Sequence, residues 1–138
     1  IYCGIETCPG YSSGNYISAF EGKIIIGDYT QIGPSVGIHA VNHSLTDNRK
    51  FFSKDVIIGK YCWLGNSAVI LPGVTLGDYT VVGAGSIVTK SFQDGFCVIA
   101  GNPAKIIKRL NPDDCVLHES NHKFNGYLSN DSFLLRTN

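Results

Sequence analysis

Apolar residues recur at every sixth position along much of this chain. An aliphatic residue opens each group of six, and the fifth position of the group mostly holds a small or β-branched residue. The openers are Ile26, Ile32, Ile38, Ile58, Leu64, Ile70, Leu76, Val82 and Val88. A period of six fits neither an α-helix, with its 3.6-residue repeat, nor one long strand. It predicts short strands joined by tight turns, each pointing one large apolar side chain inward.

The period-six pattern predicts a parallel β-helix. Three groups of six close one triangular coil of about 18 residues, as in hexapeptide β-helix repeats. Each coil buries its openers against the next coil, so stacking supplies the stability. Residues 58–93 hold six consecutive groups without a gap. An ordinary β-sandwich would show six such groups in a row only by chance, so we prefer the β-helix.

The frame weakens at the N-terminus and breaks once in the middle. Phe20 and Ile24 fit the frame and predict one more partial coil, whereas the register is lost before Gly14. Residues 44–57 interrupt the frame between two regular coils. Insertions in a solenoid form loops on one face, often the binding face, so we expect residues 44–57 to protrude as a loop.

The repeat stops after Phe92. Residues 97–110 then predict a short strand, a Gly-Asn-Pro turn and a basic segment. Residues 111–138 are polar, with two apolar clusters and no clear period. We therefore expect an all-β domain over residues 1–110 and a short C-terminal extension over residues 111–138.

Composition and charge argue against several classes of protein. The chain has 138 residues, 43% of them hydrophobic, and 11 basic side chains balance 11 acidic ones. This balance gives no indication of a nucleic-acid or membrane-surface partner. No apolar run approaches the roughly 18 residues that span a bilayer. The N-terminal residues lack the charged and apolar regions of a signal peptide, so we expect a cytoplasmic protein.

The cysteines are expected to be reduced thiols without a metal. Their count, five, is odd, which argues against a complete disulfide framework. Four residues separate Cys3 from Cys8, and no second pair completes a zinc site. Cys62 occupies the fifth position of its group, so we expect its side chain in the core.

Two stretches of the chain resemble the hexapeptide-repeat acyltransferases. They are VIIGKYCWLGNSAVILPGVTLGDYTVVGAGSIVTK and AGNPAKIIKRL, within a similarity from about Ile24 to Leu110. The similar branch contains the galactoside and maltose acetyltransferases and the O-acetyltransferases of bacterial surface polysaccharides. The resemblance implies a left-handed β-helix, a homotrimer with active sites between subunits, acetyl-CoA as co-substrate, and a sugar or glycan acceptor.

The resemblance also places a catalytic histidine at the end of one coil, just before an extended loop. Counting forward from residue 26 puts His43 at that position, whereas counting backward from the next coil without gaps puts His39 there. The loop varies in length among relatives and the groups of six do not, so we prefer His43 and keep His39 as the alternative. Neutral imidazole titrates near neutral pH and is suited to take the proton of an attacking hydroxyl.

Further site residues follow from the resemblance. Asn42 and Trp63 are expected to line the active site, although Trp63 would equally fit packing in the core or between subunits. The small residues of GAGS are expected to lie against the pantetheine arm, and lysines are expected to meet the CoA phosphates. The expected acetyl-CoA contacts are Asn66, Ala84, Gly85, Thr89, Lys90, Lys105 and Lys108. Lys105 and Lys108 are three residues apart, so a helical turn would place both on one face.

Two other classes of function share the predicted fold. A γ-type carbonic anhydrase needs three histidines on zinc, whereas the repeat contains only His39 and His43, and the other two histidines lie in the tail. A non-catalytic scaffold would need neither His43 nor the complete GAGS-to-AGNPAK stretch. We therefore predict an acetyl-CoA-dependent O-acetyltransferase for a sugar hydroxyl, with a non-catalytic β-helix scaffold or an acetyltransferase for an amine acceptor as the alternatives.

Overall fold

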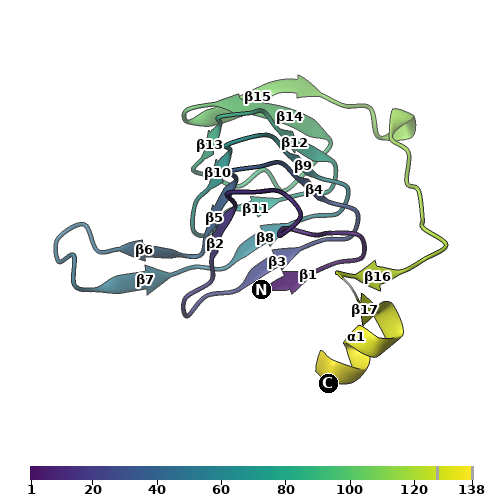
Figure 1. Ribbon diagram of the computed structural model, residues 1–138. Helices are drawn as coiled ribbons and strands as arrows, with labels where there is room; N and C mark the ends of the chain where they lie inside the picture. Colours follow the sequence, from purple (N-terminus) through teal and green to yellow (C-terminus); the bar gives the residue numbers. More distant parts are fainter. Residues whose placement is uncertain (127, 138) are drawn as a thin grey trace.

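Short parallel strands wind into a three-sided solenoid (Figure 1). The computed structural model describes residues 1–126 and 128–137. Sheet A contains β1 (Tyr2–Cys3), β3 (Ile24–Ile26), β8 (Val56–Ile58) and β11 (Thr75–Leu76). Sheet B contains β2 (Tyr16–Ser18), β5 (Gly37–His39), β10 (Val69–Ile70) and β13 (Ile87–Val88). Sheet C contains β4 (Gln31–Ile32), β9 (Trp63–Leu64), β12 (Thr80–Val82), β14 (Cys97–Gly101) and β15 (Ala104–Arg109).

The openers of the six-residue groups form the core, as the pattern predicts. Strands pair in parallel from coil to coil, so Ile26 lies opposite Ile58, and Ile58 lies opposite Leu76. The openers of the regular groups, from Ile26 to Val88, are at most 1% exposed, except Ile32, which is half-buried. Stacks of aliphatic side chains therefore run along the inside of the solenoid and hold successive coils together.

Fifth-position side chains fill the remaining interior space. Cys62 is 1% exposed, as predicted, and its burial raises the pKa of the thiol to about 12. Thr30 and Thr80 are also buried, and their hydroxyls donate to the carbonyl oxygens of Gly59 and Gly77 over 2.8 and 2.7 Å. These hydrogen bonds satisfy hydroxyl groups that would be costly to bury alone.

The solenoid begins earlier than the sequence predicts. Cys3 in β1 lies opposite Ile26, and Ile17 in β2 lies opposite Ile38, both in parallel pairs. The six-residue register is lost before Gly14, as expected, because Cys3 lies 23 positions before its partner Ile26, but the coil itself continues there. The residues between β1 and β2 are irregular and hide the period, but the two strands themselves pair with the next coil.

The partial coil around residue 20 is also arranged differently from the prediction. Ile24 is fully buried, as its place in the frame requires. Phe20, predicted as an opener, is 57% exposed, because Ile17 and Ala19 pack against the core in its place.

A hairpin leaves the solenoid at the corner between sheets B and A (Figure 1). Its strands β6 (Val41–His43) and β7 (Phe51–Ser53) are antiparallel, with His43 opposite Phe51. The sequence predicted a protrusion here with bounds of 44–57. The structure places its start at Val41, and Val56 has already returned to the coil as a buried residue of β8.

The last strand, β15, folds back antiparallel on β14. The expected helical turn through Lys105 and Lys108 is therefore wrong. The pairing still places both lysines on one face, because Ile107 is an extra residue that shifts the register. Lys105 lies opposite Ala100 and Lys108 lies opposite Val98, and strand residues two apart point to the same side.

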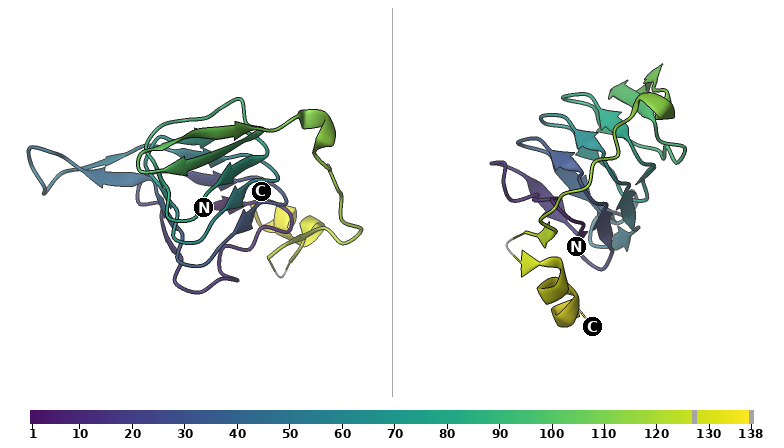
Figure 2. Two further views of the ribbon diagram at one scale, coloured as in Figure 1. Left: turned by 90° about the horizontal axis from the view of Figure 1, so that it is seen from above. Right: turned by 90° about the vertical axis from the view of Figure 1, so that its right-hand side faces the viewer.

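The C-terminal segment runs back along the corner between sheets C and A (Figure 2). It contains a short 3₁₀ helix (Pro112–Asp114), β16 (Phe124–Asn125), β17 (Leu128–Ser129) and α1 (Asn130–Thr137). At the first coil the Glu6 N–H donates to the carbonyl oxygen of Phe124 over 2.9 Å, and the Asn125 side-chain amide donates to the carbonyl oxygen of Cys3 over 3.0 Å. The segment therefore connects the last coil to the first.

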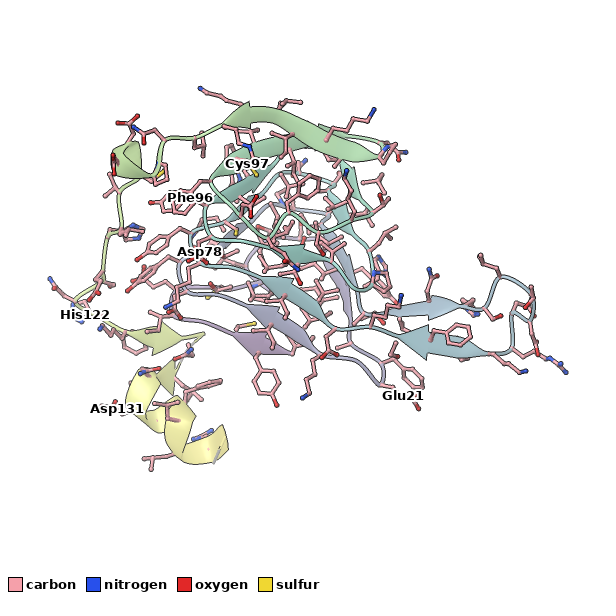
Figure 3. All side chains as sticks on the ribbon, turned by 180° about the vertical axis from the view of Figure 1, so that it is seen from behind. Glu21, Asp78, Phe96, Cys97, His122 and Asp131 are labelled. Atoms are coloured by element: carbon pink, nitrogen blue, oxygen red, sulfur yellow. The ribbon has the colours of Figure 1, made fainter. Side chains whose placement is uncertain are left out.

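Stacked aromatic rings form the surface on which this segment lies (Figure 3). Tyr29, Tyr61, Tyr79 and Phe96, here called the aromatic ladder, are separated by 5.1, 5.2 and 5.6 Å between successive ring centroids. The Tyr61 hydroxyl donates to the carbonyl oxygen of His118 over 2.8 Å, and the Tyr79 hydroxyl donates to that of Val116. One ring from each of four coils thus supports the C-terminal segment. Within the described residues, no helix is long and apolar enough to span a membrane.

Candidate active site

His43 ends β6, next to the turn of the hairpin, and a hydrogen bond fixes its ring. Its Nδ1 atom lies 2.7 Å from the main-chain carbonyl oxygen of Asn48. A carbonyl oxygen only accepts, so Nδ1 carries the hydrogen and Nε2 of the neutral ring has a free lone pair. The ring also packs against Phe51, with 4.5 Å between centroids. His43 is exposed, so its Nε2 can meet a substrate.

The turn of the hairpin holds the Asn48 carbonyl in place. The Lys50 N–H donates to the carbonyl oxygen of Asp47 over 3.0 Å, and the Ser44 N–H donates to that of Lys50 over 2.9 Å. The Arg49 side chain binds the Asp47 carboxylate at 2.9 Å. This hydrogen bond lowers the pKa of the Asp47 carboxyl, which stays ionised at neutral pH.

His39, the alternative base, lies in β5 against Tyr16 of the neighbouring coil. The two ring centroids are 5.4 Å apart. The His39 ring lies over Gly37, where an added Cβ would come within 2.9 Å of its Nε2 atom. The absence of a side chain at Gly37 therefore makes room for this ring. Among the described residues, neither ring nitrogen of His39 has a hydrogen-bond partner.

Two pockets meet at Asn42 and His43. The first, with a volume of about 250 Å³, faces the first coils and brings both histidines together; its lining is Tyr16, Ser18, His39, Val41, Asn42, His43 and Phe51. The second, of about 580 Å³, faces the later coils; its lining is Asn42, His43, Leu45, Phe52, Ser53, Lys54, Leu71, Pro72 and Thr89. His43 therefore contributes to the lining of both pockets, and its ring packs on Phe51, which lines the smaller one.

The residues predicted to bind acetyl-CoA do not all lie near His43. Thr89 lines the larger pocket and Lys90 follows it, at the same corner of the solenoid. Asn66, Ala84 and Gly85 lie at a different corner, between sheets C and B, where the Gly85 N–H donates to the Asn66 carbonyl oxygen over 2.8 Å. The width of sheet B separates the two groups within one chain.

The corner at Gly85 is open enough to admit a ligand. No atom lies within 4 Å of the position that a Gly85 Cβ would take, and its φ of +68° suits glycine. Lys105 and Lys108 are exposed on the outer face of sheet C. They belong to β15, which starts at Ala104, opposite the last residue of β14. Trp63 lies on the same sheet and is 57% exposed, which excludes the alternative that it packs in the core.

Sequence reasoning missed Tyr16, Ser18 and the role of Phe51 in the smaller pocket. Tyr16 and Ser18 lie in the irregular N-terminal region, where the period gave no frame. The pairing of β2 with β5, which places Ser18 opposite His39, is a contact between coils that no local pattern announces. The described residues contain no group of three or more His, Cys, Asp or Glu side chains that could hold a metal ion.

The repeat region of the chain matches a known protein family. Residues 55–90 match the model of the bacterial transferase hexapeptide family, which consists of six repeats. The galactoside O-acetyltransferase of Escherichia coli (strain K12) is 39% identical over 108 residues, which are 75% of this chain and 53% of that protein. The chain spans about half the length of such relatives.

Solved structures share the fold. A galactoside acetyltransferase in complex with coenzyme A has a TM-score of 0.65 and 30% identity, over 87% of this chain and 66% of that one. The polySia-specific acetyltransferase NeuO has a TM-score of 0.67 and 28% identity, over 98% of this chain and 62% of that one.

Proposed function

The repeat region of this chain belongs to the hexapeptide-repeat acyltransferase family, and we propose that the protein transfers an acetyl group from acetyl-CoA to a sugar hydroxyl. One observation carries the proposal. The His43 ring donates from Nδ1 to the carbonyl oxygen of Asn48, which leaves Nε2 free on a residue that lines two neighbouring pockets. An imidazole held in this tautomer can act as a general base between two substrates.

The proposed reaction is a direct transfer. His43 Nε2 takes the proton of the acceptor hydroxyl as the oxygen attacks the carbonyl carbon of the thioester. The tetrahedral intermediate then collapses, the carbon–sulfur bond breaks, and the proton passes from His43 to the thiolate of CoA. General-base catalysis contributes a factor of roughly 10²–10⁴ to such a step. Hydrogen-bond donors at the developing oxyanion would lower the barrier further.

The proposal assigns the donor to the side of His43 that faces the later coils. Asn42 and Thr89 would contact the reacting end of acetyl-CoA, since both line the larger pocket. Asn66, Ala84 and Gly85 would contact its pantetheine arm, and Lys90 would meet a CoA phosphate. Lys105 and Lys108, exposed on one face of β15, would meet its phosphates, and Trp63 would lie near the acceptor.

We also propose a left-handed coil and a homotrimer. His43 and Asn66 lie at different corners of one chain, so one chain alone does not bring the proposed base and donor site together. In a closed threefold arrangement each copy presents one corner to its neighbour, so the hairpin of one copy can complete the donor site of the next. Residues 1–110 would form the catalytic domain and residues 111–138 an extension that braces it.

The acceptor class follows from the similarity to galactoside and polysialic-acid acetyltransferases. A role in the biosynthesis of a polysaccharide is proposed from the similarity to putative acetyltransferases of colanic acid and lipopolysaccharide biosynthesis. The test is to incubate the full chain with radiolabelled acetyl-CoA and a panel of sugars, amino sugars and glycans. We expect label in an ester that mild alkali removes. Label in an alkali-stable amide would favour an amine acceptor. A protein that neither binds acetyl-CoA nor converts it to free CoA would contradict the proposal.

A further inference from the structure

The smaller pocket contains a second histidine that the proposed chemistry does not use. His39 and His43 are four residues apart on consecutive strands, and both line this pocket. Their surroundings differ. His43 is bound through Nδ1 to the Asn48 carbonyl oxygen, whereas both nitrogens of His39 lack partners among the described residues. The hairpin that carries His43 therefore orients the proposed base, whereas both ring nitrogens of His39 are available to hydrogen-bond a ligand.

Packing, rather than hydrogen bonding, fixes the His39 ring. Tyr16 covers one side at 5.4 Å between centroids, and the ring occupies the space above Gly37. His39 is half-buried, so its position is defined while its polar edge stays accessible to the pocket. A polar group held in one place is suited to recognise a ligand atom at low entropic cost.

The position of the pocket favours the acceptor over the donor. Thr89 and Leu71, which belong to later coils, line only the larger pocket, and the residues expected to bind CoA also lie on later coils. Tyr16 and Ser18 belong to the coil before His39 and line only the smaller one. A general base must touch the acceptor hydroxyl, and the His43 ring packs on Phe51 of the smaller pocket, so this pocket is suited to the acceptor.

The lining of the smaller pocket matches the surface of a sugar ring. Tyr16 and Phe51 are 64% and 50% exposed and offer aromatic faces, and Phe20 packs edge-on against Phe51 at 6.0 Å. Ser18, His39 and Asn42 offer polar atoms. A pyranose ring has an apolar face of C–H groups and a polar edge of hydroxyls, which these two kinds of group complement.

The same lining disfavours a charged acceptor ring. None of the residues that line the smaller pocket is a lysine, an arginine or a carboxylate. A carboxylate or phosphate on the sugar would lose its hydration there without gaining a permanently charged partner. An uncharged sugar meets no such penalty.

We propose that Tyr16 and His39 bind the acceptor as an uncharged pyranose. The sugar ring lies against Tyr16, and His39 hydrogen-bonds a hydroxyl next to the one that His43 deprotonates. His39 is thus a specificity-determining residue and not the base. This assignment rests on the proposed acetyl transfer and adds the class of its acceptor.

The test uses methyl galactopyranoside and its uronic acid analogue as acceptors for the full chain and its variants. His39→Ala and Tyr16→Ala should raise the KM for the neutral sugar about three- to tenfold, the range expected for one lost hydrogen bond or contact. The KM for acetyl-CoA should not change. Tyr16→Phe keeps the ring and should raise the KM for the neutral sugar less than Tyr16→Ala does. His122→Ala, an exposed histidine in the C-terminal segment, is the matched control.

Sugar binding gives a second readout that does not depend on turnover. Saturation-transfer NMR with CoA present should detect the neutral sugar on the wild type and a weaker signal on Tyr16→Ala. Unchanged sugar KM in both alanine variants, a wild type that binds neither sugar, or a preference for the uronic acid would each overturn the assignment. Failure of the wild type to bind CoA would instead overturn the proposed acetyl transfer itself.

Discussion

His43 donates its Nδ1 hydrogen to the main-chain carbonyl oxygen of Asn48 across 2.7 Å, at the tip of the same hairpin that carries it. The atom that accepts this hydrogen bond belongs to the backbone, so side-chain substitutions in the turn do not remove it. The Asp47–Arg49 pair and the hydrogen bonds of the turn keep that carbonyl pointed at the ring. The hairpin therefore sets both the position of the imidazole and its tautomer.

We predict that His43→Ala lowers kcat at least about 10²-fold, because the acceptor hydroxyl then loses its base. CoA affinity, measured by calorimetry, should stay nearly the same, since the donor is held mainly by other residues. The paired variant is His39→Ala, which should keep most of its kcat. The opposite result, with His39→Ala inactive and His43→Ala active, would show that the backward count of the repeat was the correct one.

The solenoid could be predicted from the sequence because each strand carries its own signal. Ile58, Leu64 and Ile70 open successive groups, and the pairing that stacks them follows from the period alone. The first coil lacks this regularity. Cys3 and Ile17 pair with the next coil across an irregular loop, and no fixed spacing marks them.

The candidate site was predictable only in part, for the same physical reason. His43 lies at a fixed place in the repeat, so counting could find it. Tyr16 meets His39 through a contact between two coils, and such contacts depend on register rather than on local pattern. The two lysines of β15 illustrate a third case. Their shared face was expected from a helix, but a bulge at Ile107 produces it.

We predict that the protein is a homotrimer in solution. The proposed base and the proposed donor site lie at different corners of one chain, so a neighbouring copy must complete the site. Light scattering should give a mass near three times that of one 14.9 kDa chain over a range of concentrations. A mass that stays near 14.9 kDa would leave the site incomplete and would contradict the proposed arrangement.

The aromatic ladder should hold the C-terminal segment against the solenoid. The double variant Tyr61→Phe/Tyr79→Phe keeps both rings but removes two hydrogen bonds to the carbonyl oxygens of His118 and Val116. A hydrogen bond of this kind contributes about 0.5–1.5 kcal/mol, so the segment should detach more often. Limited proteolysis should then cleave within residues 111–126 several times faster, while the Tm of the coils changes little.

A tyrosine outside the ladder provides the control for this experiment. Tyr11 is 90% exposed and its hydroxyl makes no hydrogen bond within the described residues, so Tyr11→Phe makes the same chemical change without removing a hydrogen bond to the segment and should leave cleavage at the wild-type rate. If the double variant is cleaved no faster than this control, the hydroxyls do not hold the segment, and ring stacking alone accounts for its position.

The last prediction concerns Lys105 and Lys108, which the bulge in β15 places on one exposed face. CoA carries a pyrophosphate and a 3′-phosphate, and two nearby cations would attract them. Exposed charges are screened by salt, with a Debye length of about 8 Å at physiological ionic strength. The double variant Lys105→Ala/Lys108→Ala should therefore raise the KM for acetyl-CoA several-fold at low salt, and the effect should shrink as salt is added.

The kcat of this variant at saturating acetyl-CoA should change little, because the phosphates are remote from the reacting thioester and their contacts are equal in the ground and transition states. The matched control is Lys23→Ala/Lys123→Ala, which removes the same charge from exposed positions elsewhere on the chain. An equal rise in KM for both double variants would mean that net charge, rather than the shared face of β15, attracts the donor. An unchanged KM in the Lys105→Ala/Lys108→Ala variant at low salt would show that this face is only solvated surface.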